Sequence, residues 1–328
     1  MLLRITSLWK ALLVVALSAG LSGAASMLAQ TATAAPAILE VKPVTFPAYD
    51  SSRRIALYAP TPAEYTRALE DRAFVMERVT YRSDDLEVYA YFYRPATPPK
   101  DRKLPVVIFN RGSYTRNDFS YEVLMLANRL AHRGYLVVAP MLRGSGGAAG
   151  HDEMGGADLH DLFNIVAVLK EIEYADPARI FLCGESRGGI MGLLAARDGF
   201  PARAAAVWGA ITDLGLFFKQ EAARRTASGI WPGWETREAE IVASRSALHW
   251  PEKINIPVLI MNGGADTDVP PVHALQLATA LEKLRKPYEL KIFHGEQHVL
   301  SGRAAERDED IVRWFRRFDV ETAFEAKP

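Results

Sequence analysis

The sequence predicts an α/β fold in which helices flank a mostly parallel central sheet with an antiparallel edge at its N-terminal side. From residue 105 onward, short apolar runs typical of buried strands alternate with amphipathic segments typical of helices. Before them, residues 77–82 and 86–93 are rich in aromatic and β-branched side chains and flank the turn Ser83-Asp84-Asp85. That pattern predicts two antiparallel strands.

The apolar runs are the expected strands of the parallel part of the sheet, and the segments between them are the expected helices. The strands are 105–109, 135–139, 180–183, 204–208, 256–261 and 290–293. The helices are 120–132, 158–173, 189–197, 272–285 and 305–318. Because the runs are apolar throughout rather than alternating with polar residues, we expect helices to cover both faces of the sheet.

A long segment between two of these strands, 212–250, interrupts the alternation. It contains the aromatic residues Phe217, Phe218, Trp231, Trp234 and Trp250. One interpretation is a small helical cap insert over the carboxyl edge of the sheet, lining the mouth of a pocket. The other is a helical excursion packed on the sheet.

The first 34 residues have the composition of a signal peptide. Arg4 and Lys10 precede an apolar run, no acidic residue occurs, and Ala32-Thr33-Ala34 matches a cleavage site between small residues. We therefore expect 1–34 to be removed and the protein to be exported, periplasmic or secreted. The alternative is an uncleaved N-terminal membrane anchor, which the Ala, Gly and Ser content of the stretch disfavours.

The rest of the chain is expected to form an N-terminal arm, 35–76, followed by one large domain, 77–328. Lys and Arg total 39 against 39 Asp and Glu, and removal of 1–34 leaves 37 basic against 39 acidic residues. A hydrophobic content of 49% excludes a disordered chain, and the balanced charge gives no support for a nucleic-acid partner. Beyond the signal segment, no membrane contact is expected.

The lone cysteine, Cys183, cannot form an internal disulfide and excludes a cysteine-rich zinc module. It lies in an apolar run and is expected to be a packing residue. Asp266, Asp268, His294 and His298 lack the spacing of a metalloprotease motif. No metal or other cofactor is therefore expected.

The sharpest local signal is Gly184-Glu-Ser186-Arg-Gly188, a G-x-S-x-G between an expected strand and an expected helix. Such a tight strand-to-helix turn strains the backbone of Ser186 and presents its hydroxyl above the sheet edge. Side chains in place of Gly184 and Gly188 would collide with the crossing backbone. Ser186 is thus the expected nucleophile. A phosphate-binding turn is the alternative, but the chain has neither G-x-G-x-x-G nor a P-loop lysine.

A serine nucleophile needs a base that is held by an acid. Asp266 and His298 each follow an expected parallel strand, and such carboxyl ends meet at one edge of a sheet. Their order along the chain, serine, acid, histidine, is that of the nucleophile-elbow architecture. Asp268 and His294 are rivals, but His294 directly continues its strand, so we expect Asp266 and His298.

From about residue 77 to 318 the chain resembles the catalytic domain of the prolyl oligopeptidase family of α/β-hydrolases, with dienelactone-hydrolase-like relatives. The matching stretches are Gly184-Glu-Ser-Arg-Gly-Gly189, Gly263-Gly-Ala-Asp266-Thr-Asp-Val-Pro270, Gly295-Glu-Gln-His298 and Arg143-Gly-Ser-Gly-Gly147. The resemblance implies an α/β-hydrolase fold, Ser186 as nucleophile, Asp266 as orienting acid and His298 as general base. It also implies a stand-alone catalytic domain, because too few residues precede it for the propeller of many relatives.

The oxyanion hole is expected to use the backbone N–H of Arg187 and one from the turn Gly112-Ser113-Tyr114. Two residues depart from the family pattern: Arg187 replaces a tyrosine, and Asn110-Arg111-Gly112 replaces H-G-G. Arg111 and Arg187 suggest recognition of a substrate carboxylate. Alternatively, Arg187 turns away and pairs with Glu185 or a helix carboxylate.

The resemblance implies a serine peptidase that acts on short peptides through an acyl-enzyme intermediate. A carboxylesterase or acetyl-esterase acting on small esters is an alternative, because the same triad serves both reactions. A non-catalytic binding module with the hydrolase fold is an alternative of another class. The expected partner in each enzymatic case is a small ester or short peptide substrate.

Overall fold

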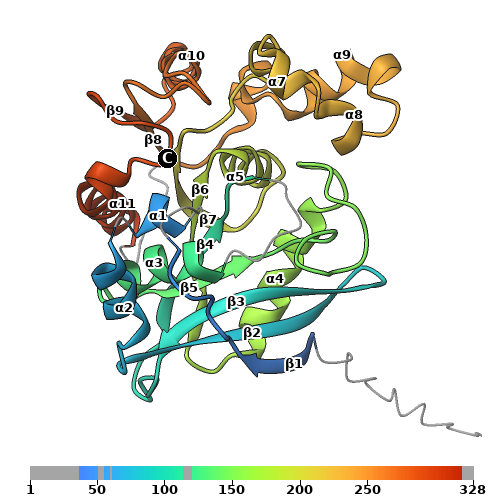
Figure 1. The fold of residues 1–328 in the computed structure, drawn as a ribbon. Helices are drawn as coiled ribbons and strands as arrows, with labels where there is room; N and C mark the ends of the chain where they lie inside the picture. Colours follow the sequence, from blue (N-terminus) through green and yellow to red (C-terminus); the bar gives the residue numbers. More distant parts are fainter. Residues whose placement is uncertain (1–36, 51–54, 60, 114–119, 320–328) are drawn as a thin grey trace, which may run out of the picture. The chain divides into compact units, whose positions relative to one another are not determined.

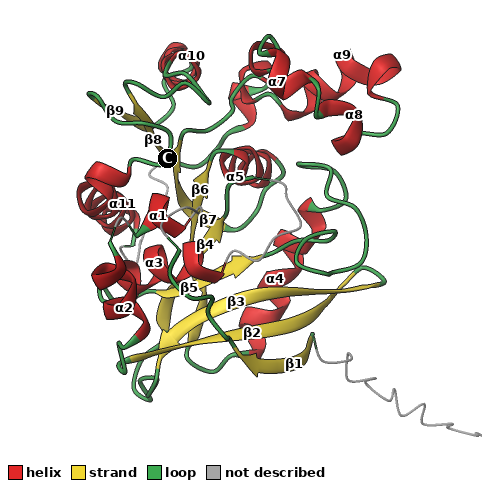
Figure 2. Cartoon of the chain, viewed as in Figure 1, coloured by secondary structure: helices red, strands yellow, loops and turns green. Residues whose placement is uncertain are grey.

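A nine-stranded sheet runs through the part of the chain that the structure, a computed structural model, describes: residues 37–50, 55–59, 61–113 and 120–319 (Figures 1 and 2). The order across the sheet is β1-β2-β3-β5-β4-β6-β7-β8-β9. The strands are β1 Ile38–Pro43, β2 Phe74–Ser83, β3 Leu86–Pro95, β4 Leu104–Asn110, β5 Leu136–Pro140, β6 Ala175–Glu185, β7 Ala202–Trp208, β8 Val258–Gly263 and β9 Tyr288–Phe293.

The sheet is antiparallel at its N-terminal edge and parallel elsewhere. Strands β2 and β3 form a hairpin closed by the pair Ser83 and Leu86, and β3 runs antiparallel to β5. From β5 through β4, β6, β7 and β8 to β9 every pair is parallel. The predicted mixed sheet is therefore confirmed.

Helices cover both faces, as the apolar strands require. Neighbouring residues of β4 point to opposite sides: Val106 and Ile108 pack with α4, α5 and α10, whereas Val107 and Phe109 pack with α1, α2, α3 and α11. These helices are α1 Ile55–Tyr58, α2 Pro62–Leu69, α3 Ser120–Ala131, α4 Leu159–Glu171, α5 Arg187–Arg197, α10 Val272–Lys283 and α11 Ala304–Phe318. Two cores thus fix the central strands whose ends carry the candidate site.

The N-terminal arm has more structure than the sequence predicts. Strand β1 pairs antiparallel with β2, the domain sheet begins at Phe74 rather than 77, and the short helices α1 and α2 bury Tyr58 and Tyr65. Thr61 and Glu64 form a capping box at the start of α2. The sequence predicts an arm here without naming its elements, because β1 is mostly exposed and α1 has only four residues, so neither leaves a hydrophobic period.

The expected signal peptide lies outside the described residues. Within the described residues, none of the helices combines the length and the apolar character that crossing a membrane requires.

The insert 212–250 is helical and lies above the carboxyl ends of the parallel strands (Figure 1). Its elements are α6 Leu214–Phe217, α7 Glu221–Arg224, α8 Ala227–Ile230, α9 Trp234–Arg245 and the 3-10 turn Ala247–His249. Outside the insert, 3-10 turns are formed by Pro251–Lys253 and Ser301–Arg303. Phe218, Trp231 and Trp234 pack against one another, with ring centroids 4.8 to 5.6 Å apart. These rings belong to the hydrophobic core on one face of the sheet, and this packing anchors the insert.

Candidate active site

Ser186 occupies the tight turn between β6 and α5. Its backbone angles, φ 53° and ψ −119°, lie in a region that a non-glycine residue rarely adopts. The strain is held by the N–H of Ser186, which donates to the carbonyl of Trp208 on β7 (2.9 Å), and by its carbonyl, which accepts from Gly189 (2.9 Å). The turn thus places the Ser186 side chain at the carboxyl edge of the sheet.

The flanking glycines have no room for a side chain. A Cβ on Gly184 would lie 2.4 Å from the carbonyl oxygen of Gly188, and a Cβ on Gly188 would lie 1.8 Å from that of Asn110. These distances are far inside van der Waals contact. The crowding is the collision that the sequence predicts for a nucleophile elbow.

Asp266 and His298 come together from the loops after β8 and β9. His298 Nδ1 lies 2.8 Å from Asp266 Oδ2, and because a carboxylate only accepts, Nδ1 donates and Nε2 keeps its lone pair. Asp266 Oδ1 accepts the backbone N–H groups of Asp268 and Val269, each at 2.9 Å. The buried Asp266 carboxylate is therefore fixed in place and orients the imidazole.

The two rival residues lie elsewhere. His294 is exposed just after β9 and does not line the pocket described below. Asp268 is exposed at the pocket rim, where its backbone N–H supports Asp266. The structure thus brings together the pair favoured by the sequence and leaves its rivals apart.

Opposing effects set the proton affinity of His298. Burial lowers its pKa, but the hydrogen bond and charge of Asp266 raise it, and the charges of Glu185 and Asp268 raise it further. The net result is a pKa above the usual histidine value of 6.5. The imidazole is therefore a somewhat stronger base than a free histidine.

A pocket of about 570 Å³ contains Ser186 and His298. Its other walls come from the sheet edge, from the insert and from α1. They are formed by Leu57, Ser113, Glu185, Phe217, Gln220, Ala223, Thr226, Asp268, Val269, Gln297, Val299 and Ser301. The insert contributes Phe217, Gln220, Ala223 and Thr226, so it lines this pocket as well as packing on the sheet.

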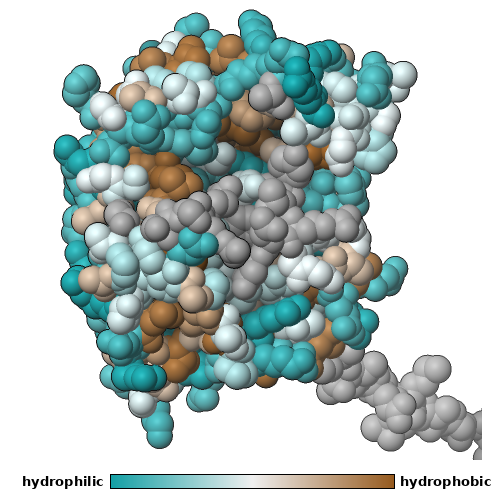
Figure 3. Space-filling model, in the orientation of Figure 1, coloured by the Kyte–Doolittle hydropathy of each residue, from teal (hydrophilic) through white to brown (hydrophobic). Residues whose placement is uncertain are grey.

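The face of the molecule in Figure 3 shows no large hydrophobic patch among its described residues. On the face shown in Figure 3, hydrophobic residues form separate small groups among hydrophilic ones. Among the described residues, no group of histidine, cysteine and acidic side chains is arranged to hold a metal ion.

The expected oxyanion side lies next to Ser186. Arg187 is the first residue of α5, where backbone N–H groups have no partner within the helix. Gly112 approaches from β4, and a Cβ on it would lie 3.5 Å from Ser186 Cβ. Ser113 has a positive φ of 59° and lines the pocket. Tyr114 lies outside the described residues.

The Arg111 side chain does not face the pocket. It is fully buried and donates to the carbonyls of Gly112 (2.9 Å) and Ser113 (2.8 Å) and to the hydroxyl of Ser145 (2.6 Å). Burial, followed by the nearby charge of Arg187, lowers the pKa of Arg111 to about 10. Arg111 therefore braces the turn that approaches Ser186, and the suggested contact with a substrate carboxylate is wrong for this side chain.

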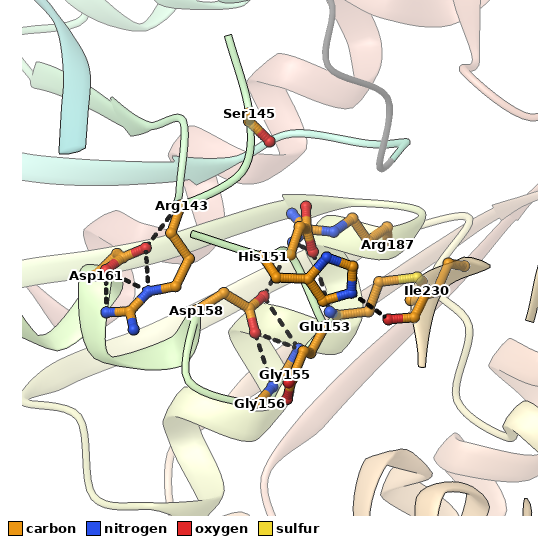
Figure 4. A network of polar contacts seen from close by, with 12 residues as sticks. Arg143, Ser145, His151, Glu153, Gly155, Gly156, Asp158, Asp161, Arg187 and Ile230 are labelled. Carbon is orange, nitrogen blue, oxygen red and sulfur yellow. Dashed lines mark hydrogen bonds and ion pairs between the residues drawn. The ribbon is translucent and has the colours of Figure 1, made fainter. Parts of the chain in front are cut away.

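Arg187 also turns away from the pocket. Its Nη2 donates to Asp152 Oδ1 (2.5 Å) and Asp158 Oδ2 (3.1 Å), so it pairs with acids near the start of α4 and not with Glu185 (Figure 4). Asp158 also accepts the N–H groups of Gly155 and Gly156. Of the two interpretations for Arg187, pairing with a carboxylate near a helix is the one that the structure supports.

Asp158 shares the Arg187 guanidinium with Asp152 and is fully buried, which affects the pKa of Asp158. Burial, and then the charge of Asp152, raises the pKa of Asp158 to about 6 although Arg187 and two backbone N–H groups oppose the shift. Close by, Arg143 holds Asp161 through its backbone N–H (2.6 Å) and its guanidinium (2.7 Å). These contacts of Arg143 with Asp161 and of Arg187 with Asp158 hold the loop between β5 and α4 in place (Figure 4).

Cys183 is fully buried in β6, and burial raises the pKa of its thiol well above the usual value. It is therefore a packing residue, as expected from the sequence.

Sequence reasoning gave no function to Glu185 and did not find Tyr58. The Tyr58 hydroxyl donates to Glu185 Oε1 at 2.7 Å, beside Ser186. A charged residue at the end of an otherwise apolar strand was the only signal in the sequence.

The strained serine elbow and the buried Asp-His pair at the carboxyl edge of a mixed sheet define the α/β-hydrolase class. The prolyl oligopeptidase family model matches residues 117–319, which is more than half of the chain. The chain therefore belongs to the prolyl oligopeptidase family, a family of serine peptidases.

Individual relatives agree with this assignment. An uncharacterized peptidase, YtmA, of Bacillus subtilis is 28% identical over 235 residues, which cover 70% of this chain and 85% of the relative. The acylamino-acid-releasing enzyme of Rattus norvegicus is 26% identical over 260 residues, which cover 73% of this chain but 34% of the relative. The chain thus spans most of the bacterial relative and about a third of the mammalian one.

Solved structures give the same fold. A puromycin-hydrolyzing peptidase of Mycobacterium tuberculosis aligns with a TM-score of 0.64 and 26% identity over 74% of this chain and 39% of that chain. The acylaminoacyl peptidase of Pyrococcus horikoshii aligns with a TM-score of 0.65 and 22% identity over 77% of this chain and 43% of that chain. The predicted family, fold and serine-peptidase class are confirmed.

Proposed function

We propose that this chain hydrolyses short peptides with Ser186 as nucleophile, His298 as general base and Asp266 as the acid that orients it. One observation carries the proposal: Ser186, on its strained elbow, shares a pocket with a His298 whose Nδ1 is held by the buried Asp266. Family membership and relatives named as peptidases favour an amide over an ester substrate.

In the proposed reaction His298 Nε2 takes the proton of the Ser186 hydroxyl while its oxygen attacks the peptide carbonyl. His298 then gives that proton to the leaving nitrogen as the C–N bond breaks, and an acyl-enzyme ester remains. A water molecule attacks the ester, again losing a proton to His298, which returns it to Ser186 as the acid product leaves. Asp266 stabilises the imidazolium in both halves.

Negative charge on the carbonyl oxygen needs donors that are in place before the reaction. The backbone N–H of Arg187 is the proposed first donor, and the turn at Gly112 and Ser113 is the proposed source of the second. Arg111 supports this assignment, because its bonds to the carbonyls of both turn residues fix the turn beside Ser186.

We also propose that residues 1–34 direct export.

The test is a rate panel on the purified protein with aminoacyl and dipeptidyl p-nitroanilides beside short-acyl p-nitrophenyl esters. The proposal expects nitroanilide hydrolysis that Ser186→Ala lowers about 10⁶-fold. Hydrolysis of esters alone would replace the peptidase by an esterase. Nitroanilide turnover that survives in Ser186→Ala would refute the assignment of the nucleophile.

A further inference from the structure

Glu185 lies beside the nucleophile and has no part in the reaction above. Only 1% of its surface is exposed, yet it lines the pocket that holds Ser186 and His298. Oxygen Oε1 accepts the Tyr58 hydroxyl at 2.7 Å, whereas the buried Oε2 has no hydrogen-bond partner among the described residues. Glu185 thus lines the pocket and has one buried carboxylate oxygen without a partner among the described residues.

A buried carboxylate with a single neutral donor is costly to keep in a folded protein. The charge of Arg307 acts on Glu185, but its guanidinium hydrogen-bonds elsewhere: it donates to the carbonyl of Val299 and to Asp308, each at 2.8 Å, and lies over the Trp208 ring. No ion pair joins Glu185 to an arginine or lysine in the described structure. Glu185 therefore has no hydrogen-bonded or ion-paired cation within the described residues, and a cationic group of a bound molecule would supply one.

The charge of the pocket points in the same direction. Its described lining contains two carboxylates, Glu185 and Asp268, and no lysine or arginine. Arg111 and Arg187, the two side chains that would have attracted an anionic substrate, are turned away onto carbonyl oxygens and buried acids. The charged side chains of the described lining are therefore mainly acidic, which favours a cationic group over a substrate carboxylate there.

We propose that Glu185 is a specificity-determining residue that receives a cationic nitrogen of the substrate next to the scissile carbonyl. This inference rests on the proposed function, since it assigns the substrate class of the same pocket. A peptide has two sources of such a nitrogen: the free α-ammonium of its first residue and the side chain of lysine or arginine.

The short distance along the chain from Glu185 to Ser186 favours the α-ammonium, which is two bonds from the first carbonyl carbon. Apolar side chains of Leu57, Phe217 and Val299 on the other walls leave a hydrophobic environment for the side chain of that residue. The substrate class is then a peptide or amide with a free, hydrophobic N-terminal residue.

The test compares three substrates that differ in the position of one positive charge: leucine p-nitroanilide, N-acetyl-leucine p-nitroanilide and N-acetyl-lysine p-nitroanilide. Rates are measured at a pH well above the pKa of His298, so that His298 is neutral in every assay. The variants are Glu185→Gln, which removes the charge but keeps the shape, and the matched control Asp268→Asn, which removes an exposed charge from the same pocket.

We expect wild type to prefer leucine p-nitroanilide over its acetylated form, and Glu185→Gln to lower kcat/KM for the free amine roughly 10- to 150-fold. The acetylated substrate should change by less than about threefold, and Asp268→Asn should preserve the preference, because exposed charges are screened. A preference for N-acetyl-lysine instead would move the cation to the side chain.

Equal losses for charged and neutral substrates in Glu185→Gln would overturn the inference and assign Glu185 to the triad or to stability. A binding measurement separates this result from a failure of the proposed function. In Ser186→Ala, calorimetry should show leucinamide binding more tightly than N-acetyl-leucinamide, and Glu185→Gln in that background should abolish the difference. Equal binding of both amides would refute the cation site whatever the chemistry of Ser186.

Discussion

Replacement of Arg187 by methionine tests the ion network behind the nucleophile. The change removes a guanidinium whose side chain is 2% exposed and leaves Asp152 and Asp158, with side chains 7% and 0% exposed, without their shared cation. Removing one partner of a buried pair costs about 3–5 kcal/mol, because the remaining charge stays desolvated. This loss is a large fraction of the free energy of unfolding of a typical protein, which is about 5–15 kcal/mol.

The expected loss converts into a measurable melting shift. For a chain of this size the entropy of unfolding is about 0.6 kcal/mol per degree, so the Tm of Arg187→Met should fall by about 5–8 °C at pH 8. The surface residue Arg224, which pairs with Glu238 in solvent, provides the matched control. Arg224→Met should melt close to wild type, because exposed pairs contribute little.

The pH dependence of the loss gives a second check. Burial has already raised the pKa of Asp158 to about 6, and removal of Arg187 raises it further. A carboxyl whose folded-state pKa is raised destabilises the fold as pH rises through that value, so the deficit should be full at pH 8 and smaller at pH 5. Unchanged melting at pH 8, or equal deficits at both pH values, would refute the reasoning.

Three further predictions follow from the site. His298 must be neutral to act as a base, and its pKa is raised, so kcat/KM should fall as the pH drops through an apparent pKa above 6.5. Glu185→Gln should shift this fall in kcat/KM to lower pH, because the charge of Glu185 raises the pKa of His298. An unchanged pH profile in the variant would contradict that contribution of Glu185. Gly188→Ala should prevent folding or abolish activity, whereas Gly192→Ala, whose new Cβ would have its nearest neighbour at 3.9 Å, should melt at or slightly above the wild-type Tm. Phe217→Ala should raise KM more than it lowers kcat, as steady-state kinetics would show, since Phe217 lines the pocket but is not one of the proposed reacting groups.

The sequence predicts the central part of the fold because that part is buried on both faces. The six apolar runs are strands β4 to β9, and the helices between them begin and end within a few residues of the expected positions. Strand β1 and helix α1 were not predicted, because an exposed edge strand and a four-residue helix give the sequence no hydrophobic periodicity.

The positions of Ser186, Asp266 and His298 follow from local patterns, since each lies just past the end of a strand that sequence periodicity reveals. The partners of Arg187 do not, because Asp152 and Asp158 precede it by 35 and 29 residues and meet it only after the loop before α4 folds back. The contact between Tyr58 and Glu185 spans 127 residues and depends on an arm without a pattern. Only the structure therefore shows where the side chains of Arg111 and Arg187, which depart from the family motif, point.

Covalent labelling shows whether Ser186 is the activated nucleophile. The folded protein is treated with a fluorophosphonate at a pH well above the pKa of His298, and the modified peptide is located by mass spectrometry. The account predicts stoichiometric modification of Ser186, slowed strongly in His298→Ala and absent in Ser186→Ala. Modification of another residue, or labelling of Ser186 at the same rate without His298, would contradict it.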